Sequence, residues 1–151
     1  MTNRILVPLD GSGTSEAALD EAIRQATAFH LPVHLVRVVD THVLEQVGGS
    51  AAAFNYTMLG EMFEQESDEA ESYLDEIASR LEREGLTVTR EVLVGPIARS
   101  IIAEVEPGDM IVMGSHGRSG IRRWVLGSIA EDVLRHAHVP VLLVKQSHPE
   151  S

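Results

Sequence analysis

Apolar runs of strand length alternate with amphipathic segments of helical length along most of this 151-residue chain. Five runs have the length and composition of buried strands, at residues 4–9, 33–39, 87–94, 110–113 and 139–145. Four segments between them repeat apolar residues at helical spacing, at 15–30, from about Thr57 to Gly85, at 96–105 and at 129–137. Strands that alternate with helices predict a mostly parallel sheet with helices on both faces.

The longest helical segment ends at Gly85, which has the role of a helix C-cap. Its methionines and aromatic residues, among them Met62, Phe63 and Tyr73, follow the apolar face, so we expect them in the core. Residues 41–56 contain a Gly-Gly-Ser sequence, which favours a mobile loop that serves as a lid or a contact surface.

Composition limits the location of the protein and the classes of ligand. We expect one domain over residues 1–146 with a short tail at 147–151. No apolar run approaches the roughly 18 residues of a membrane span and no leader precedes the first strand, so we expect a cytoplasmic protein. The chain has no cysteine, which excludes disulfides and thiolate catalysis. Its formal net charge of −11 argues against binding to nucleic acid or to a membrane, since both attract cationic surfaces.

A glycine-rich segment follows the run at 110–113, at the place where an open parallel sheet binds its ligands. Gly114 and Gly117 lack side chains, so the backbone can turn tightly and an anion can approach its N–H groups. Gly127 and Ser128 then open a helix, whose first N–H groups and dipole favour phosphate. Three basic residues lie in the same segment: Arg118, Arg122 and Arg123. The segment therefore predicts an anion site.

Several of these residues have a second interpretation. Ser128 and Glu131 match a capping box, in which Ser128 is the N-cap of the helix and contacts no ligand. Asp10 either caps the turn or helix after the first strand or contacts a ligand. His116 either acts as an acid or phosphate donor or positions the loop through backbone contacts. The arginines are either solvated charges or electrostatic partners of the phosphates.

Two common phosphate-binding motifs are excluded. Lys145 is the only lysine of the chain, so the lysine that a P-loop needs after its glycines is absent. The dinucleotide fingerprint belongs after the first strand of a sheet, whereas this segment follows the fourth. Two glycines separated by two residues are weak evidence alone, so the spacing of the whole segment carries the information.

The whole segment reads Gly114, two residues, Gly117, nine residues, then Gly127-Ser128. In this spacing the chain resembles the universal stress protein family, in its nucleotide-binding branch, whose signature is Gly-x2-Gly-x9-Gly-Ser/Thr. The resemblance covers nearly the whole chain. It includes three further stretches: residues 5–12, Val38-Val39-Asp40 and residues 139–144.

The resemblance implies an open five-stranded parallel sheet, in the strand order 3-2-1-4-5, that binds ATP. Asp10 matches an aspartate beside the adenosine, and Val38 matches the position whose backbone recognises adenine. The full set of positions that the resemblance assigns to the nucleotide is Pro8, Leu9, Asp10, Val38, Met113, Gly114, His116, Gly117, Arg118, Gly127, Ser128 and Ile129. A Mg²⁺ or Mn²⁺ ion would be held mainly by the phosphate oxygens.

The resemblance also implies a homodimer through the fifth strand, and Val141–Val144 is an apolar edge that agrees physically with such pairing. The implied function is that of an ATP-binding regulator or stress-response protein with at most slow hydrolysis. The alternatives are an ATPase or phosphoryl-transfer enzyme and a protein that binds AMP or cyclic AMP. A phosphoacceptor receiver domain is disfavoured, because residues 92–95 lack the aspartate expected after the third strand.

Overall fold

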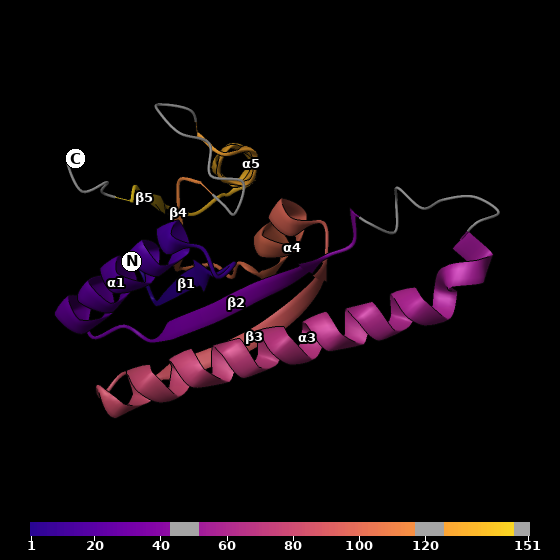
Figure 1. Cartoon of the computed structure of the whole chain (residues 1–151). Helices are drawn as coiled ribbons and strands as arrows, with labels where there is room; N and C mark the ends of the chain where they lie inside the picture. Colours follow the sequence, from indigo (N-terminus) through magenta and orange to yellow (C-terminus); the bar gives the residue numbers. More distant parts are fainter. Residues whose placement is uncertain (43–51, 117–125, 147–151) are drawn as a thin grey trace, which may run out of the picture.

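The computed structural model of the chain describes residues 1–42, 52–116 and 126–146 (Figure 1). Strands and helices alternate along it, as the sequence predicts. In chain order they are β1 (Arg4–Pro8), α1 (Gly13–Phe29), β2 (Val33–Asp40), α3 (Ala52–Arg83), β3 (Val88–Gly95), α4 (Ile97–Glu104), β4 (Asp109–Gly114), α5 (Ser128–His136) and β5 (Val141–Val144).

The strands form one sheet in the order β3-β2-β1-β4-β5, and every pair of neighbours is parallel. This is the strand order that the resemblance to the universal stress protein family implies. Parallel neighbours are connected by right-handed helical crossovers in almost all proteins, so a sheet of this order has its helices distributed over both faces. Because β1 pairs with both β2 and β4, the direction of winding reverses between β1 and β4.

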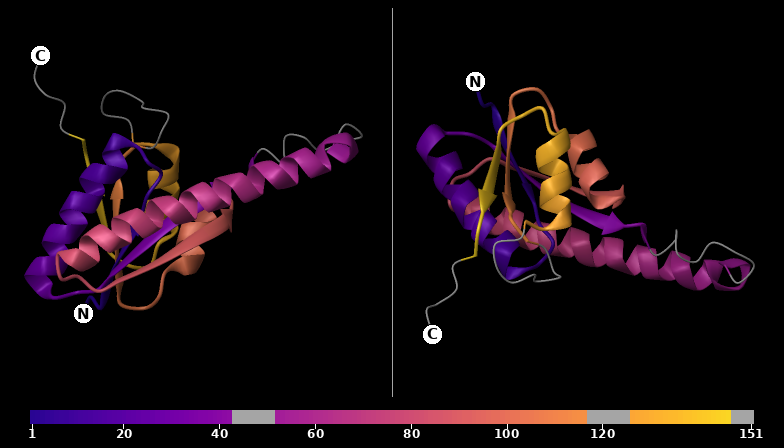
Figure 2. Two further views of the ribbon diagram at one scale, coloured as in Figure 1. Left: turned by 60° about the horizontal axis from the view of Figure 1, so that its bottom comes forward. Right: turned by 90° about the horizontal axis from the view of Figure 1, so that it is seen from above.

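The helices divide the core into two layers, one on each face of the sheet (Figure 2). Helices α1 and α3 cover one face, where Leu19 and Leu74 pack against the strands. Helices α4 and α5 cover the other face, where Ile101 and Val133 are buried. The central strand β1 contributes side chains to both layers, and its core residues are fully buried, as expected for a parallel sheet covered on both faces.

Helix α3 begins at Ala52, five residues before the expected start, so the predicted loop at 41–56 is shorter than expected. A helix of 32 residues is about 48 Å long at 1.5 Å per residue, whereas the eight residues of β2 or β3 span about 27 Å. The first half of α3 therefore extends past the sheet (Figures 1 and 2).

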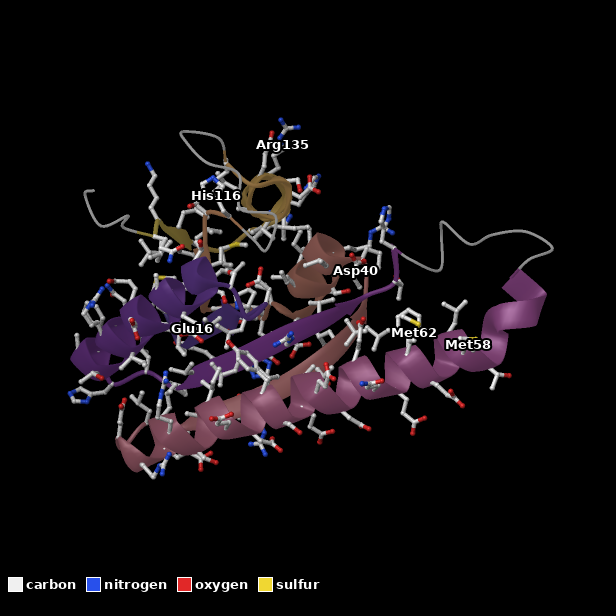
Figure 3. The ribbon with its side chains drawn as sticks, viewed as in Figure 1. Glu16, Asp40, Met58, Met62, His116 and Arg135 are labelled. Carbon is white, nitrogen blue, oxygen red and sulfur yellow. The ribbon has the colours of Figure 1, made fainter. Side chains whose placement is uncertain are left out.

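This overhang overturns one prediction about the core. Met62 is 54% exposed and Met58 is 63% exposed, because no strand lies beneath this part of α3 (Figure 3). Phe63 is partly buried, and Tyr73 packs against the core as expected. None of the helices in the described ranges combines the length and the apolar character that crossing a membrane requires.

Candidate functional site

The carboxyl ends of β1 and β4 lie side by side, because these two strands are neighbours in the sheet. The chain segments that follow them are the loop with Asp10 and the segment that starts at Gly114. In open parallel sheets a crevice forms where the winding reverses, outside the carboxyl ends of the strands. The structure thus shows that the segments after β1 and β4 are adjacent, as the predicted position of these two strands requires.

Asp10 forms the turn between β1 and α1. Its Oδ1 accepts a hydrogen bond from the backbone N–H of Ser12 at 2.9 Å, which is an Asx turn. Ser12 in turn is the N-cap of α1, since its Oγ accepts from the N–H of Ser15 at 3.2 Å. Asp10 thus caps the turn and Ser12 caps the helix, while the contact of Asp10 with a ligand stays a prediction.

Gly114 is required by the packing of α1 against β4. A Cβ atom at this position would lie 2.6 Å from the Thr14 Cγ2 and 3.1 Å from the carbonyl carbon of the same residue. Real Cβ atoms are never so close to a neighbouring atom, so a side chain here would push the start of α1 away from the sheet. Gly114 thus has a structural role in addition to the proposed approach of an anion.

Two backbone hydrogen bonds of Ser115 connect the end of β4 to its neighbours, one to β5 and one to the start of α5. Ser115 donates its N–H to the carbonyl of Val144 at 2.9 Å, and Gly127 donates to the carbonyl of Ser115 at 2.8 Å. His116 lies next in the chain, with its Nδ1 3.0 Å from the Oγ of Ser115. Gly117 and Arg118, like the other two arginines of the segment, lie outside the described residues.

The capping box predicted at the start of α5 is wrong. Gly127 is the N-cap, in an extended conformation, and its carbonyl accepts the first helical bond from the N–H of Glu131 at 2.9 Å. Ser128 is therefore the first residue inside the helix, where its side chain is exposed and cannot fill the N-cap position. The carboxylate of Glu131 instead accepts from Arg135 at 2.9 Å.

Three of the residues that the resemblance assigns to the nucleotide belong to a single hydrophobic cluster. Val38 from β2, Met113 from β4 and Ile129 from α5 all pack into the layer between the sheet and helices α4 and α5. Pro8 ends β1 and is partly buried, and Leu9 is buried and donates its N–H to the carbonyl of Val36 at 2.8 Å. An apolar wall therefore lies close to the polar start of α5.

A groove of about 690 Å³ opens between the end of β2 and helices α4 and α5. Ser128 and Ile129 line it from α5, and Asp40 lines it from the end of β2, where Figure 3 labels it. Its remaining lining residues are Thr41, His42, Pro96, Ile97, Ala98, Arg99, Ile102, Asp132 and His136. The sequence analysis did not predict that residues of α4 line the groove. Helix α4 follows β3, and it reaches the groove because β3 pairs with β2.

This arrangement suits a ligand that has an apolar part and an anionic part. Gly127 has no side chain with which to cap α5, so this residue leaves the first N–H groups of the helix for an anion. Apolar side chains such as Ile97 and Ile129 provide contact area for a flat organic group. Charged groups of both signs, among them Asp40 and Arg99, surround the groove.

Comparisons with known proteins agree over the full length of the chain. The model of the universal stress protein family matches residues 1–145. A universal stress protein of Methanocaldococcus jannaschii, MJ0531, is 36% identical over 149 residues, which cover 97% of this chain and 84% of the relative. The solved structure of the MJ0577 protein of the same organism has 31% identity and a TM-score of 0.83, with 99% of both chains covered.

Two further solved structures are complexes with nucleotides. A universal stress protein from Archaeoglobus fulgidus is in complex with dAMP, and another universal stress protein is in complex with cAMP. Each is 23% identical to this chain, with a TM-score of 0.66, and the match covers 96% of this chain and 98% of the other. At this identity the likeness shows a common fold.

Proposed function

This chain belongs to the universal stress protein family, and from that premise we propose that it binds an adenine nucleotide, ATP in preference, in the crevice at the carboxyl ends of β1, β2 and β4. The observation that carries the proposal is the start of α5. A glycine-capped helix N-terminus opens at the place where the winding of the sheet reverses, next to an apolar groove.

In this proposal the adenosine and the phosphates contact different parts of the site. The adenosine lies near Asp10 and the backbone of Val38, beside the apolar cluster to which Met113 and Ile129 belong. The phosphates approach the backbone of the glycine segment and the first turn of α5. The residues proposed for them are Gly114, Gly117, Gly127 and Ser128, with His116 and Arg118 as neighbours.

A Mg²⁺ or Mn²⁺ ion fits this site as a companion of the nucleotide. Both ions prefer oxygen ligands, and phosphate oxygens provide them. Asp10 and Asp40 are the carboxylates at the ends of β1 and β2, and the carboxylate of Asp10 accepts a bond in the turn before α1. We therefore propose that the phosphates supply most of the ligands and that the ion neutralises part of their charge.

We favour a regulatory role over efficient catalysis. Rapid phosphoryl transfer needs a positioned nucleophile and strong stabilisation of the phosphoryl charge, usually with a lysine or a carboxylate-held metal ion. The single lysine, Lys145, follows β5, and the described part of the site presents no P-loop. Nucleotide binding would then act by shifting the population of conformations that a partner recognises. The cytoplasmic location and the homodimer remain predictions.

Calorimetric titration with ATP and with a non-hydrolysable analogue tests this function. Both should bind below millimolar concentration, and a product assay should show little ADP. The Ser128→Ala variant should bind about tenfold more weakly, since a hydrogen bond to a charged group contributes about 1.5–3 kcal/mol. Its urea midpoint should stay unchanged, because the exposed side chain of Ser128 does not cap α5.

The matched control is Ser72→Ala, which removes an exposed serine hydroxyl from α3 and should bind ATP like the unchanged protein. Gly117→Val should abolish binding, because a branched side chain blocks the approach of the phosphates to the backbone. If neither ATP nor the analogue binds, the proposed nucleotide site is contradicted. Rapid formation of ADP would support the enzyme instead, and tighter binding of AMP or cyclic AMP would change the preferred ligand.

A further inference from the structure

Three potential metal ligands lie close together on the side of the sheet away from the crevice, toward the amino ends of the strands. His34 is the second residue of β2, Glu91 lies on β3, and Glu104 is the last residue of α4. One ligand atom from each of the three side chains lies within 4.8 Å of the other two. In the described part of the chain this is the one such group found.

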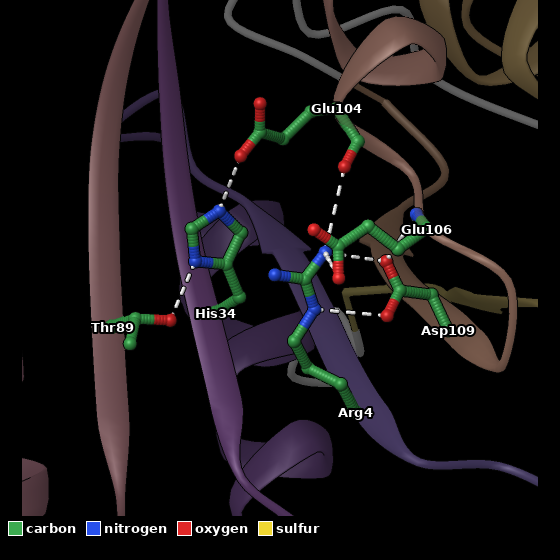
Figure 4. A network of polar contacts seen from close by, with 6 residues as sticks. All are labelled: Arg4, His34, Thr89, Glu104, Glu106 and Asp109. Carbon is green, nitrogen blue, oxygen red and sulfur yellow. Dashed lines mark hydrogen bonds and ion pairs between the residues drawn. The ribbon is translucent and has the colours of Figure 1, made fainter.

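The imidazole of His34 is held in place on both sides (Figure 4). The residue is 5% exposed, its Nδ1 lies 2.7 Å from the Oγ1 of Thr89, and its Nε2 lies 2.7 Å from the Oε1 of Glu104. Thr89 is the register partner of His34 on β3, so the sheet itself positions the hydroxyl. Metal-binding histidines usually have such a partner on the nitrogen that does not bind the metal.

We propose that His34 Nε2, Glu91 and Glu104 bind a divalent transition metal ion of the Zn²⁺ class. When Nδ1 donates its proton to Thr89, Nε2 turns a lone pair toward the two carboxylates. Without a metal ion, Nε2 has to carry a proton to face the carboxylate of Glu104 at this distance. Metal binding needs that proton on Nδ1 instead, where the hydroxyl oxygen of Thr89 accepts it, so the imidazole stays neutral and changes its tautomer.

The required adjustments are small and fall on the side chains that can move. Zn²⁺ binds nitrogen and oxygen ligands at about 2.0–2.2 Å, so tetrahedral ligand atoms lie roughly 3.4 Å apart. The contact between His34 and Glu104 has to open slightly, and Glu91 has to approach. Glu91 is exposed and the side chain of Glu104 is 23% exposed, whereas buried His34 stays in place. Three protein ligands leave a coordination position for water.

The surrounding charges favour a cation here. Arg4 lies nearby and its Nη2 approaches the backbone carbonyl of Glu104 at 3.4 Å. Its charge is already matched by Asp109, whose two carboxylate oxygens accept from Arg4 at 2.9 and 2.7 Å, and by Glu106 at 3.8 Å (Figure 4). Arg4 pairs foremost with Asp109, and the carboxylates of Glu91 and Glu104 are the acidic groups grouped with His34.

The ligand chemistry separates this site from the ion that would accompany a nucleotide. Imidazole nitrogen favours Zn²⁺ and its neighbours in the transition series, whereas Mg²⁺ prefers oxygen ligands and keeps its waters. Excess Mg²⁺ should therefore not displace Zn²⁺ from His34. The site also lies at the other end of the strands from Asp10 and Gly114, so it needs no nucleotide.

Calorimetric titration of the full chain with Zn²⁺, in excess Mg²⁺ and without nucleotide, tests the proposal. One Zn²⁺ should bind per chain, and binding should saturate at that ratio. Glu91→Gln and Glu104→Gln should each weaken binding about tenfold or more, since even the indirect partners of metal ligands affect affinity by about 10–100-fold. Both variants should keep the circular dichroism spectrum of the unchanged protein.

The matched control is Glu106→Gln, which removes a carboxylate from the same network but not from the group around His34. It should bind Zn²⁺ like the unchanged protein. Thr89→Val removes the hydroxyl that orients the imidazole of His34 but removes no proposed metal ligand. This variant should bind Zn²⁺ more weakly and still bind one Zn²⁺ per chain. Absence of saturable binding, or equal binding by Glu91→Gln, Glu104→Gln and the unchanged protein, would overturn the proposal. A failure of ATP binding would leave this result unaffected.

Discussion

Tyr73 combines a buried hydroxyl group with a polar neighbourhood. Among the described residues its hydroxyl oxygen has no hydrogen-bond partner, although solvent does not reach that atom. The guanidinium carbon of Arg37 lies 4.7 Å from the centre of its ring. Burial raises the pKa of Tyr73 above its ordinary value of 10.0, and the carboxylates of Glu16 and Asp10 raise it further while Arg37 lowers it.

Replacement of Tyr73 by phenylalanine should remove the cost of this buried hydroxyl. We expect Tyr73→Phe to increase the free energy of unfolding by about 1 kcal/mol at neutral pH, measured by urea denaturation. Because the pKa of Tyr73 is higher in the folded than in the unfolded state, ionisation of the phenol favours the unfolded state. The free energy of unfolding is therefore unaffected by this titration below the ordinary pKa, and it falls as the pH rises through the raised pKa of the folded state. The variant should therefore lose less stability than the unchanged protein above pH 10. A clear loss of stability at neutral pH would mean that the hydroxyl has a partner.

At the residue scale the sequence predicted where the caps and turns lie better than which residue forms each of them. Asp10 and Ser12 are both good caps, and only the structure shows that Asp10 forms the turn while Ser12 caps α1. Ser128 matched a capping box, yet a shift of one residue gives the cap to Gly127. The propensities of neighbouring residues for the N-cap position are too similar to fix the start of a helix to within one residue.

At the scale of elements, α3 consists of two halves with different surroundings. From Ala70 to Leu81, its apolar residues are buried against the sheet. Before Ala70 the helix extends beyond the strands and exposes Met58 and Met62 (Figure 3). Leu59 is the one buried side chain among the described residues of this half, so its backbone hydrogen bonds should open without unfolding of the rest of the protein.

Hydrogen exchange of the α3 amides tests this difference, with Gly60→Ala as the probe. Nothing lies within 4 Å of a Cβ at position 60, and alanine favours a helix interior over glycine by about 1 kcal/mol. The variant should slow exchange around residue 60 about fivefold and leave the global urea midpoint almost unchanged. Ala78→Gly, in the packed half, should lower that midpoint. A matching rise of the midpoint in Gly60→Ala would show that both halves unfold as one unit.

The helices and strands and their order along the chain were predictable, because strand-length apolar runs and helical periodicity are local properties of the sequence. The overhang of α3 was not predictable in the same way. Periodic apolar residues continue through Met58 and Met62 whether or not a strand lies beneath them. The group of His34, Glu91 and Glu104 was also missed, since these residues meet only through the register of β2 with β3 and the return of α4.

At the scale of the whole molecule, β5 is one edge of the sheet and β3 is the other. The carbonyls of Pro140 and Val144 accept hydrogen bonds from β4, so the backbone groups of Val141 and Leu143 point away from the sheet. Among the described residues no further strand pairs with this apolar edge, and such an edge can pair with a second copy of the chain. The homodimer that the family resemblance implies is compatible with this geometry and stays a prediction.

Leu143→Pro tests the dimer, because proline removes an outward N–H without removing a bond to β4. Sedimentation velocity should show a dimer for the unchanged protein and a monomer for this variant, with the circular dichroism spectrum retained. Val94→Pro is the matched control on the opposite edge, since the bond from Thr41 to the carbonyl of Gly95 directs the backbone of Val94 outward. It should remain a dimer. Equal dissociation of both variants, or a monomer at the start, would contradict pairing through β5.

The hydrogen bond between Gly127 and the carbonyl of Ser115 has a consequence for the evolution and engineering of the site. It ties together the two ends of the segment 116–126 independently of any ligand. The entropic cost of a closed loop grows slowly, by about 0.6 kcal/mol for each doubling of its length. Residues inserted into this segment should therefore leave the sheet intact, so the length of the segment can be varied without loss of the fold.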